Sequence, residues 1–432
     1  MYLASLLLLS AALATQVREE LRFAWNAYER YAWGHDELKP LSRTGHDWYG
    51  ESLVLTPVDA LDSLILLGLD EEASRATELI VERLSFDRDV PVQVFEITIR
   101  HLGGLLASHQ LTGDARFLRL AEDLGSRLLP AFASQTGMPY RFVSLKTGAT
   151  SGARSNPAEI GTLVLEFCTL ARLTHNDVFC ARAKNALVQL HARRSAIGLV
   201  AEEIDVDTGE WTSRASHVGG GIDSYYEYLL KCERLFDDRD CARMWRTSRR
   251  ALRRRLADDT PTGLWFGQVD AESGTRTATE FGALHAFLPG LLALDGDLRR
   301  ARRLQASCFS MWTLNGIEPE VLDYRTMQIV RPGYPLRPEI IESAFYLYRA
   351  TKDPRYLQMG RTFFEGLKAH CRTDAGYTTL DDVVTKAQGD AMPSYFLAET
   401  LKYLYLLFAP DDALDLDAVV LNTEAHPLRR VR

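Results

Sequence analysis

The feature that most constrains the fold is a repeated unit of two apolar-periodic segments joined by a short polar turn. Apolar residues at helical spacing flank each turn, and the turns are rich in Gly, Asp and Asn. Asp favours the start of a helix, and Gly or Asn favours its end. Seven such turns occur, roughly 45 to 62 residues apart, at residues 68–70, 112–114, 175–177, 237–240, 295–297, 351–354 and 410–412. The sequence therefore predicts an all-α fold of about seven helical hairpins, arranged as an open solenoid or as a closed ring.

Long connections join the other ends of the hairpins and include short strand-like stretches. They cover residues 86–94, 133–157, 196–221, 258–279, 315–338 and 373–393. Long connections inside a compact fold are usually functional. An acidic residue lies at or near the start of each following helix: Asp59, Glu96, Glu159, Asp223, Glu280, Glu339 with Glu342, and Glu399. If alternate helices form the inner wall of a ring, these carboxylates gather at one rim.

Any one of these acidic residues has an ordinary explanation, because negative charge is stabilised near a helix N-terminus. The set needs a further reason, since several members are embedded in apolar sequence. Glu96 follows Val94 and Phe95, and Glu342 follows Ile340 and Ile341. Buried acids are uncommon unless they are paired, bind a metal or take part in catalysis.

The rest of the chain limits its organisation and its partners. The net charge is -8 and no linker divides the sequence, so we predict a single domain over residues 15–432. Residues 1–14 are either a secretory signal or the start of the first helix, and export is the favoured interpretation. The basic run at residues 246–255 is interpreted as a solvated helix face, with no nucleic-acid partner. No segment reaches the apolar length of a bilayer span, so we expect no stable membrane insertion, and a monomer.

A ring of carboxylates near aromatic side chains suits a carbohydrate site. Aromatic rings in the connections, such as those of Trp48, Trp265 and Tyr377, would cover the apolar face of a sugar, while Arg100 and Arg337 would bond its hydroxyls or the acids. Glycosidic cleavage needs one carboxyl as general acid and another as base or nucleophile. Crowding of like charges raises some carboxyl pKa values and keeps an acid protonated. The sequence contains no nucleophile elbow, phosphate-binding Gly loop or His/Cys zinc spacing.

Five long segments carry a more specific signal. They are residues 94–106 (VFEITIRHLGGLL), 220–231 (GGIDSYYEYLLK), 336–343 (LRPEIIES), 395–408 (YFLAETLKYLYLLF) and 422–427 (NTEAHP). In this order they resemble the class I α-mannosidases, glycoside hydrolase family 47. Weaker matches at residues 47–50 and 58–64 extend the resemblance to nearly the whole chain. It implies an (α/α)7 barrel, a closed toroid of seven helical hairpins with short β-hairpins in the connecting loops.

The resemblance also implies an activity: Ca2+-dependent, inverting exo-hydrolysis of terminal α-1,2-linked mannose from oligosaccharides or N-glycans. Carried over by motif, Glu339 would be the general base and Glu96 the general acid, with Asp223 the alternative proton donor. Thr423 would bind Ca2+ through its hydroxyl and carbonyl oxygens, and waters ordered by Glu342, Glu399 and Glu424 would complete the coordination, as suits a cation that prefers oxygen. Contacts to the substrate are expected from Arg100, Glu159, Arg337, Glu342, Tyr395 or Phe396, Glu399 and Glu424.

Two departures leave the branch preference open. Gly282, Ala283 and Ala286 stand where processing mannosidases typically carry an Asp-His pair and a cysteine, and this section is closer to the degradation-enhancing branch. Residues 423–427 are closer to the processing enzymes, and Gly221 is small where some members carry a bulky residue. The alternative function is a mannose-glycan-binding, lectin-like protein with little turnover, although a pure binder need not keep a complete acid, base and metal set. A toroid acting on another substrate, such as an unsaturated glycuronide, would explain the architecture but not the motifs.

Two further expectations concern cysteines and location. Cys168, Cys232 and Cys308 lie in apolar helical patterns and are predicted to be buried thiols, while disulfide pairing cannot be predicted from sequence. The compact length resembles a bacterial secreted member of the family, so a secreted or periplasmic location is predicted.

Overall fold

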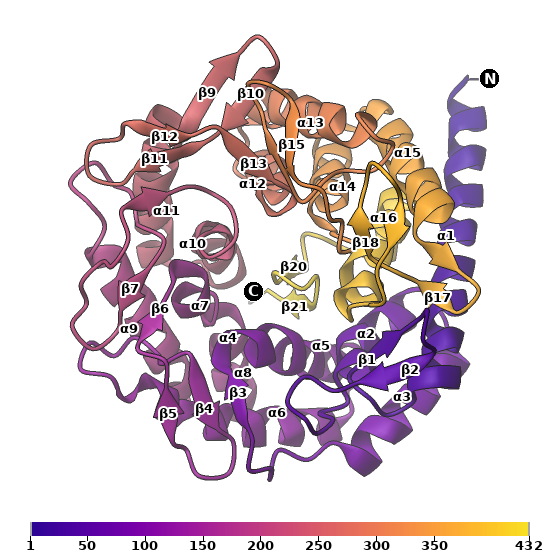
Figure 1. Ribbon diagram of the computed structural model, residues 1–432. Helices are drawn as coiled ribbons and strands as arrows, with labels where there is room; N and C mark the ends of the chain where they lie inside the picture. Colours follow the sequence, from indigo (N-terminus) through magenta and orange to yellow (C-terminus); the bar gives the residue numbers. More distant parts are fainter. Residues whose placement is uncertain (1, 431–432) are drawn as a thin grey trace.

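Helices that are apolar on nearly every face alternate along the chain with helices that are apolar on one face only. The computed structural model describes the backbone of residues 2–430 and the side chains of residues 10–430. In it the first kind forms an inner ring and the second an outer ring around it (Figure 1). The inner ring consists of α2 (Leu55–Leu66), α4 (Val94–Ile97) with α5 (Gly103–Thr112), α7 (Pro157–Gly161) with α8 (Val164–Thr174), α10 (Asp223–Phe236), α12 (Leu288–Leu294), α14 (Glu339–Thr351) and α16 (Leu401–Phe408). The outer ring consists of α1 (Tyr2–Ala32), α3 (Asp70–Arg83), α6 (Ala115–Leu128), α9 (Asp177–Ala192), α11 (Arg239–Ala251), α13 (Leu298–Thr313) and α15 (Arg355–His370).

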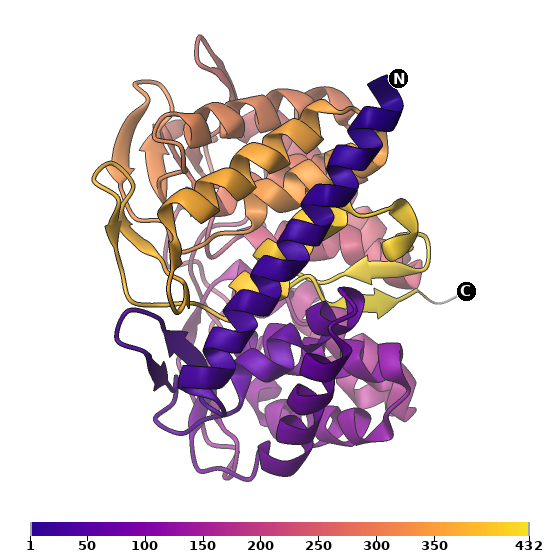
Figure 2. The same cartoon turned by 90° about the vertical axis from the view of Figure 1, so that its right-hand side faces the viewer.

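The predicted (α/α)7 barrel is confirmed, but its seventh hairpin is formed differently. Six predicted turns each join an inner helix to an outer helix. The turn at residues 410–412 instead leads through a 3-10 turn (Asp411–Ala413) to strand β20 (Val419–Leu421), so its assignment as a helical hairpin was wrong. The partner of α16 is α1, which packs against it from the other end of the chain (Figure 2). Residues 2–14, within the segment that the sequence left open, are continuous with the rest of α1.

Short antiparallel β-hairpins fill the connections, as predicted, and all but the last of them lie at one end of the barrel (Figure 2). The strands are β1 (Glu37–Lys39) with β2 (Thr44–His46); β3 (Pro91–Gln93), β4 (Phe142–Ser144) and β5 (Thr150–Ser151); β6 (Arg154–Ser155) with β7 (Ile204–Asp205); β8 (Ala215–Ser216), β11 (Gln268–Asp270) and β12 (Arg276–Ala278); β9 (Ala257–Thr260) with β10 (Gly263–Phe266); β13 (Glu280–Gly282), β14 (Val321–Asp323) and β15 (Gln328–Arg331); β16 (Arg372–Thr373) with β17 (Gly376–Tyr377); β18 (Leu380–Asp382) with β19 (Ala387–Gln388); and β20 (Val419–Leu421) with β21 (Pro427–Arg429). Several of these sheets pair strands from successive connections and so link neighbouring hairpins.

Four of the hairpin turns share one local structure. In each, an Asp carboxylate accepts hydrogen bonds from the backbone N–H groups two and three residues later. The residue three positions after the Asp is a Ser or Thr. The aspartates are Asp205, Asp270, Asp323 and Asp382. The residue after the Ser or Thr has a positive φ, which completes the reversal. The spacing Asp-x-x-Ser/Thr therefore marks the tips of these connections.

Strands β20 and β21 differ from the other hairpins, because they enter the barrel from the opposite end (Figure 2). Viewed along the axis of the barrel, this hairpin lies at the centre of the ring (Figure 1). The chain near its described C-terminal end thus closes the bottom of the barrel, while the other connections surround its mouth.

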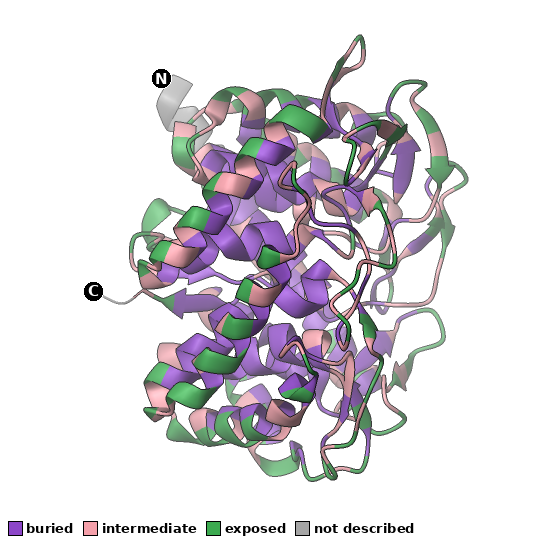
Figure 3. Ribbon diagram, turned by 90° about the vertical axis from the view of Figure 1, so that its left-hand side faces the viewer, coloured by how far each residue is buried: buried purple, intermediate pink, exposed green. Residues whose placement is uncertain are grey.

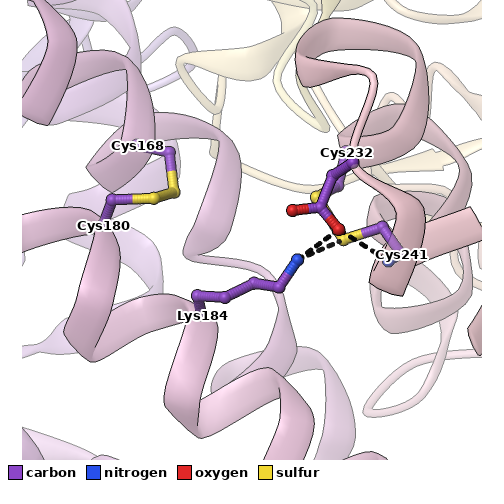
Figure 4. Close-up of a disulfide and its surroundings, with 6 residues drawn as sticks. Cys168, Cys180, Lys184, Cys232 and Cys241 are labelled. Atoms are coloured by element: carbon purple, nitrogen blue, oxygen red, sulfur yellow. Dashed lines mark hydrogen bonds and ion pairs between the residues drawn. A yellow bond between two sulfur atoms is a disulfide. The ribbon is translucent and has the colours of Figure 1, made fainter.

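Burial follows the two rings, with buried residues inside and exposed ones on the outer helices (Figure 3). Two disulfides tie inner to outer helices: Cys168–Cys180 joins α8 to α9, and Cys232–Cys241 joins α10 to α11 (Figure 4). The prediction of free thiols at Cys168 and Cys232 was therefore wrong, because hairpin geometry brings a partner close to each. Cys308 is a buried thiol, as predicted.

None of the described helices is both long enough and apolar enough to cross a lipid bilayer.

Candidate active site

The inner ring encloses a cavity of about 340 Å³ at the hairpin end of the barrel. The starts of the inner helices converge there, which brings together residues far apart in sequence. Of the predicted site residues, those that line the cavity are Glu96, Arg100, Glu159, Asp223, Arg337, Glu339, Glu342, Tyr395, Glu399, Thr423 and Glu424. The gathering of carboxylates at one rim is therefore what the alternating-helix argument predicted.

Two acidic residues of the predicted rim lie elsewhere. Glu280 is exposed on β13, outside the cavity, because its connection forms a strand before the next helical turn begins. Asp59 is fully buried below the cavity, where it is engaged in ion pairs. The aromatic cover predicted from the connections was also partly wrong, since Trp265 and Tyr377 are fully buried and pack between connections.

Local backbone structure sets the direction of several of these side chains. Glu339 and Asp223 are the first residues of α14 and α10. Arg100 lies in a π-helical turn (Thr98–Leu102) between α4 and α5, and Glu399 lies in another (Phe396–Thr400) before α16. Compared with an α-helical turn, a π-helical turn contains an additional residue and so changes the direction of the side chains that follow. Such turns are frequent at functional sites.

Arg100 connects three acidic groups on one wall. Its Nε donates to Glu96 Oε2 at 2.9 Å, and its Nη1 donates to Glu424 Oε2 at 2.6 Å. The same Nη1 lies 3.7 Å from Asp59 Oδ2. Because Arg100 is only 7% exposed, these pairs are shielded from water and hold the wall in a defined geometry.

Tyr395 forms the aromatic side of the cavity. Its ring lies between two guanidinium groups, 5.5 Å from Arg100 Cζ and 6.0 Å from Arg337 Cζ. Arg337 is in turn held by both carboxylate oxygens of Glu320, at 2.9 and 3.2 Å. Phe396 does not line the cavity: it is fully buried, with its ring centroid 4.8 Å from that of Tyr377. Of the two residues predicted to stack on the sugar, only Tyr395 faces the cavity, because the π-helical turn directs the next side chain into the core.

Burial dominates the protonation of the cavity acids. It raises the pKa of Asp223 to about 7 and the pKa of Glu339 to about 8, against the opposing charge of Arg337 in both cases. It also raises the pKa of Glu342 and of Glu424 to about 8, where Lys231 and Arg100 respectively oppose it. Burial and then the charge of Glu424 raise the pKa of Glu399 well above its ordinary value. The site thus holds several acids that are protonated near neutral pH unless a cation offsets their charge.

The base of the cavity is rich in oxygen and fits a hard cation. Thr423 reaches it from the turn between β20 and β21, with Glu342, Glu399 and Glu424 around it. Glu339 Oε2 is buried without a hydrogen-bond partner among the described residues. No three acidic or histidine ligand atoms of this cavity lie within 4.8 Å of one another in the described part of the chain. A cation here would therefore take few direct carboxylate ligands and would leave room for water, as Ca2+ coordination allows.

Buried ionic contacts fix the turn that carries Thr423. His426 lies between Asp59 Oδ1 at 3.1 Å and Asp62 Oδ2 at 2.9 Å. Burial opposes protonation of His426, but the charge of Asp62 and the two hydrogen bonds together raise its pKa to about 9. Two buried lysines donate to backbone carbonyls of the turn, Lys231 to Asn422 at 3.2 Å and Lys402 to Ala425 at 2.8 Å. The position of Thr423 is thus set by the inner helices.

Sequence reasoning did not assign Glu227 and Lys231, which belong to the same face. Glu227 lines the cavity one helical turn after Asp223, and Lys231 follows one turn later, ion-paired with Glu227 and 3.8 Å from Glu342. The signal was present, because residues at i, i+4 and i+8 share one face of a helix. Glu320, the partner of Arg337, gave no such signal, since it contacts the site from a connection.

A comparison with known families decides the class of this site. The sequence profile of glycosyl hydrolase family 47 matches residues 20–430. The chain belongs to this family. It is therefore a glycoside hydrolase, as predicted, with the cavity described above at the centre of the family's fold.

Relatives from both expected branches of the family resemble the chain over nearly its whole length. A mouse protein named ER degradation-enhancing alpha-mannosidase-like protein 2 is 39% identical over 96% of this chain and 77% of the relative. Pig mannosyl-oligosaccharide 1,2-alpha-mannosidase IA is 35% identical over 96% of this chain and 67% of the relative. The structure of an alpha-1,2-mannosidase from Trichoderma reesei superposes with a TM-score of 0.89 at 27% identity, covering 98% of this chain and 99% of that one. These eukaryotic relatives give no support to the expected bacterial origin.

Proposed function

We propose that this family 47 member is an inverting, Ca2+-dependent exo-α-1,2-mannosidase that removes terminal α-1,2-linked mannose from oligosaccharides or N-glycans. The observation that carries the proposal is the cavity itself. It combines candidate acids at Glu96 and Asp223, a candidate base at Glu339 and an oxygen-rich base around Thr423. Relatives named for 1,2-alpha-mannosidase activity support the linkage.

Glu339 is the proposed general base. It lies at the start of α14, and Oε2 has no hydrogen-bond partner among the described residues, so this oxygen is free to bind a water molecule. A base must be ionised, whereas burial raises the pKa of Glu339 to about 8; the guanidinium of Arg337 opposes this shift, and the charge of a cation bound near Thr423 would lower the pKa of Glu339 further. Attack by the activated water on the face opposite the leaving group would invert the anomeric centre.

Asp223 is the proposed proton donor, with Glu96 as a positioning partner. Burial raises the pKa of Asp223 to about 7, so a substantial fraction of this acid keeps its proton near neutral pH. Glu96 Oε2 is already engaged by Arg100 at 2.9 Å. A substrate such as α-mannosyl fluoride, which leaves without a proton, separates the two roles: Asp223→Asn should retain most activity on it while losing activity on a disaccharide. Glu96 would be the proton donor if Asp223→Asn lost both activities while Glu96→Gln kept activity on the fluoride and lost it on the disaccharide.

Tyr395 and the charged groups around it would orient the terminal sugar. Its ring offers an aromatic face, and Arg100, Arg337, Glu159 and Glu399 offer hydrogen bonds to hydroxyl groups. When bound at Thr423, with waters ordered by the surrounding acids, Ca2+ would supply a positive charge that holds sugar hydroxyls and favours ionised carboxylates. The cavity admits few residues of a glycan, which agrees with removal of a terminal residue.

Release of mannose from α-1,2-mannobiose tests the proposal, measured in EDTA and again after Ca2+ is restored. We expect activity to be lost and then recovered, and the first product seen by proton NMR to be the β anomer. Glu339→Gln is the matched control, since it should bind the disaccharide without turning it over. An initial α product would refute inversion, and EDTA-resistant turnover would refute the calcium requirement. Binding without any turnover by the parent protein would favour the lectin-like alternative.

We also infer that the chain works in an oxidising compartment. Two disulfides, Cys168–Cys180 and Cys232–Cys241, support this, because such bonds persist in secretory or extracellular surroundings and are rare in reducing ones. Secretion, cleavage of residues 1–14 and the monomeric state stay predictions. Fractionation of the expressing cell, with the N-terminal sequence of the mature chain, tests the first two.

A further inference from the structure

A basic groove lies on the outer wall of the barrel, away from the active-site cavity. It has a volume of about 840 Å³ and is formed between the end of α9, residues 194–198 and the face of α11 with the π-helical turn (Leu252–Leu256) that follows. Figure 1 places α9 and α11 next to each other on the left side of the ring. Its lining contains six arginines and no acidic residue: Arg194, Arg243, Arg246, Arg250, Arg254 and Arg255.

Most arginines of the groove have no acidic partner among the described residues, whereas others on the same helix are paired. Arg249 and Arg253 bind Asp295 at 2.8 and 3.0 Å, and so attach α11 to the neighbouring hairpin. Among the described residues, only Arg243 of the six groove arginines forms an ion pair, with Asp240.

The row formed by Arg246, Arg250 and Arg254 is exposed. Like charges one turn apart repel and reduce helix stability, so such a row has a cost that no contact within the described chain offsets. The net charge of the whole chain is -8, which makes a concentration of positive charge at one place distinct from the general surface.

We propose that this groove binds an acidic segment of a polypeptide, a run of Asp and Glu side chains. Arginine clusters recognise acidic motifs because the planar guanidinium pairs with a carboxylate through two parallel hydrogen bonds. The groove contains arginine and no lysine, which favours recognition by geometry as well as by charge.

The remaining lining disfavours other anionic partners. No aromatic side chain is present on which the bases of a single-stranded nucleic acid could stack. Ile197 is the only large apolar side chain, whereas binding to a membrane surface uses a broad apolar face beside the basic one.

The groove is connected to the active site through the backbone. The connection that starts at the groove, at residues 194–198, ends at Gly220 and Gly221 in the wall of the cavity. A protein held in the groove would therefore contact the connection whose far end forms part of the cavity wall. The proposal itself does not depend on the activity of the cavity, and it is tested by binding alone.

The test uses the full chain and a short fluorescent peptide of alternating Asp and Glu, measured by polarisation. We expect saturable binding that weakens as salt is raised, and no binding of a Ser-Gly peptide of equal length. The variant R246E/R250E/R254E should weaken binding by about tenfold or more, since it reverses the charge of the row. The matched control is R119E/R299E/R302E, which makes the same change in net charge at exposed arginines on α6 and α13. Both variants should release mannose at the parent rate.

Several outcomes would overturn the proposal. If R246E/R250E/R254E and the control R119E/R299E/R302E lost binding equally, the peptide would be attracted by the overall charge of the protein and there would be no groove site. Tight binding of an oligonucleotide or of anionic vesicles, with none of the peptide, would assign the groove to that other polyanion. Competition by inorganic phosphate as effective as that by the peptide would reduce the groove to a small-anion site. A circular-dichroism spectrum identical to that of the parent ensures that loss of binding in the groove variant is not loss of fold.

Discussion

Glu318 offers a strong test of how burial and charge are balanced in this barrel. It precedes β14, is fully buried, and neither of its carboxyl oxygens has a hydrogen-bond partner among the described residues. Burial first, and then the charges of Glu339 and Glu320, raise its pKa well above the ordinary value, while Arg337 opposes them. The thiol of Cys308 on α13 faces the same group. We predict that Glu318→Leu stabilises the protein, and that the gain grows with pH.

The magnitude follows from two contributions. A buried polar group without a partner costs about 1–3 kcal/mol, which leucine of similar size removes. The pKa of Glu318 is higher in the folded protein than in the unfolded chain, so protonated Glu318 contributes fully to stability at low pH. As pH rises between the two pKa values, the free energy of unfolding of the parent falls by about 1.4 kcal/mol per pH unit. For a chain of 432 residues, 1 kcal/mol corresponds to about 1 °C in Tm, so we expect a gain of a few degrees at neutral pH.

The assay is thermal unfolding followed by circular dichroism at about pH 5 and about pH 8, in EDTA throughout. Glu318→Gln serves as the control, because it removes the titration but keeps the polar atoms without partners. The Tm difference between Glu318→Leu and Glu318→Gln should therefore be the same at both pH values and should report only the cost of the polar atoms without partners. A Tm of Glu318→Leu below that of the parent at the higher pH would refute the reasoning. So would a Tm difference between Glu318→Leu and the parent that is equal at both pH values.

Three further predictions test other parts of the structure. Replacing Cys168 and Cys180 by alanine opens a 12-residue loop and should cost about 3 kcal/mol, read as a lower Tm that no longer responds to reductant at this site; an unchanged Tm would contradict it. Gly104→Ala would place a Cβ 2.6 Å from a backbone oxygen of α2 and should cost about 1–3 kcal/mol in denaturant unfolding, whereas Gly333→Ala, where the nearest atom lies 3.6 Å from the new Cβ and φ is not positive, should cost less. Thr423→Ala should weaken Ca2+ binding measured by calorimetry, and an unchanged titration would exclude this residue as a ligand.

The hairpin repeat could be predicted from the sequence because its signals are local. Apolar periodicity and capping residues recur in every unit, so the number and order of the hairpins follow. The pairing of α1 with α16 could not be predicted in the same way, since it joins segments nearly 400 residues apart and replaces the turn expected at residues 410–412. The disulfides were missed for a related reason: Cys168 and Cys232 look like core residues until the partner helix is in place.

The candidate site was predictable where a residue's place at a helix start decides its direction. Glu339 and Asp223 begin α14 and α10 and reach the cavity for that reason. Prediction failed where the backbone departs from a regular helix. The strand at Glu280 keeps this acid outside, and the π-helical turn at Phe396–Thr400 gives the cavity Tyr395 and sends Phe396 into the core. Glu320 and Glu318 act from a connection, where no periodicity assigns a direction.

The base of the cavity depends on the closure of the whole ring. The turn that carries Thr423 comes from the far end of the chain, and its contacts come from separate inner helices: Asp59 and Asp62 of α2, Glu166 of α8, Lys231 of α10 and Lys402 of α16. These residues meet only when the helices that carry them are in place around the turn, because each helix supplies a different side of it. Completion of the site therefore depends on the packing of the ring. It follows that a substitution in the seam between α1 and α16, far from the cavity, should lower stability and activity together, whereas a change in one exposed hairpin tip should alter neither.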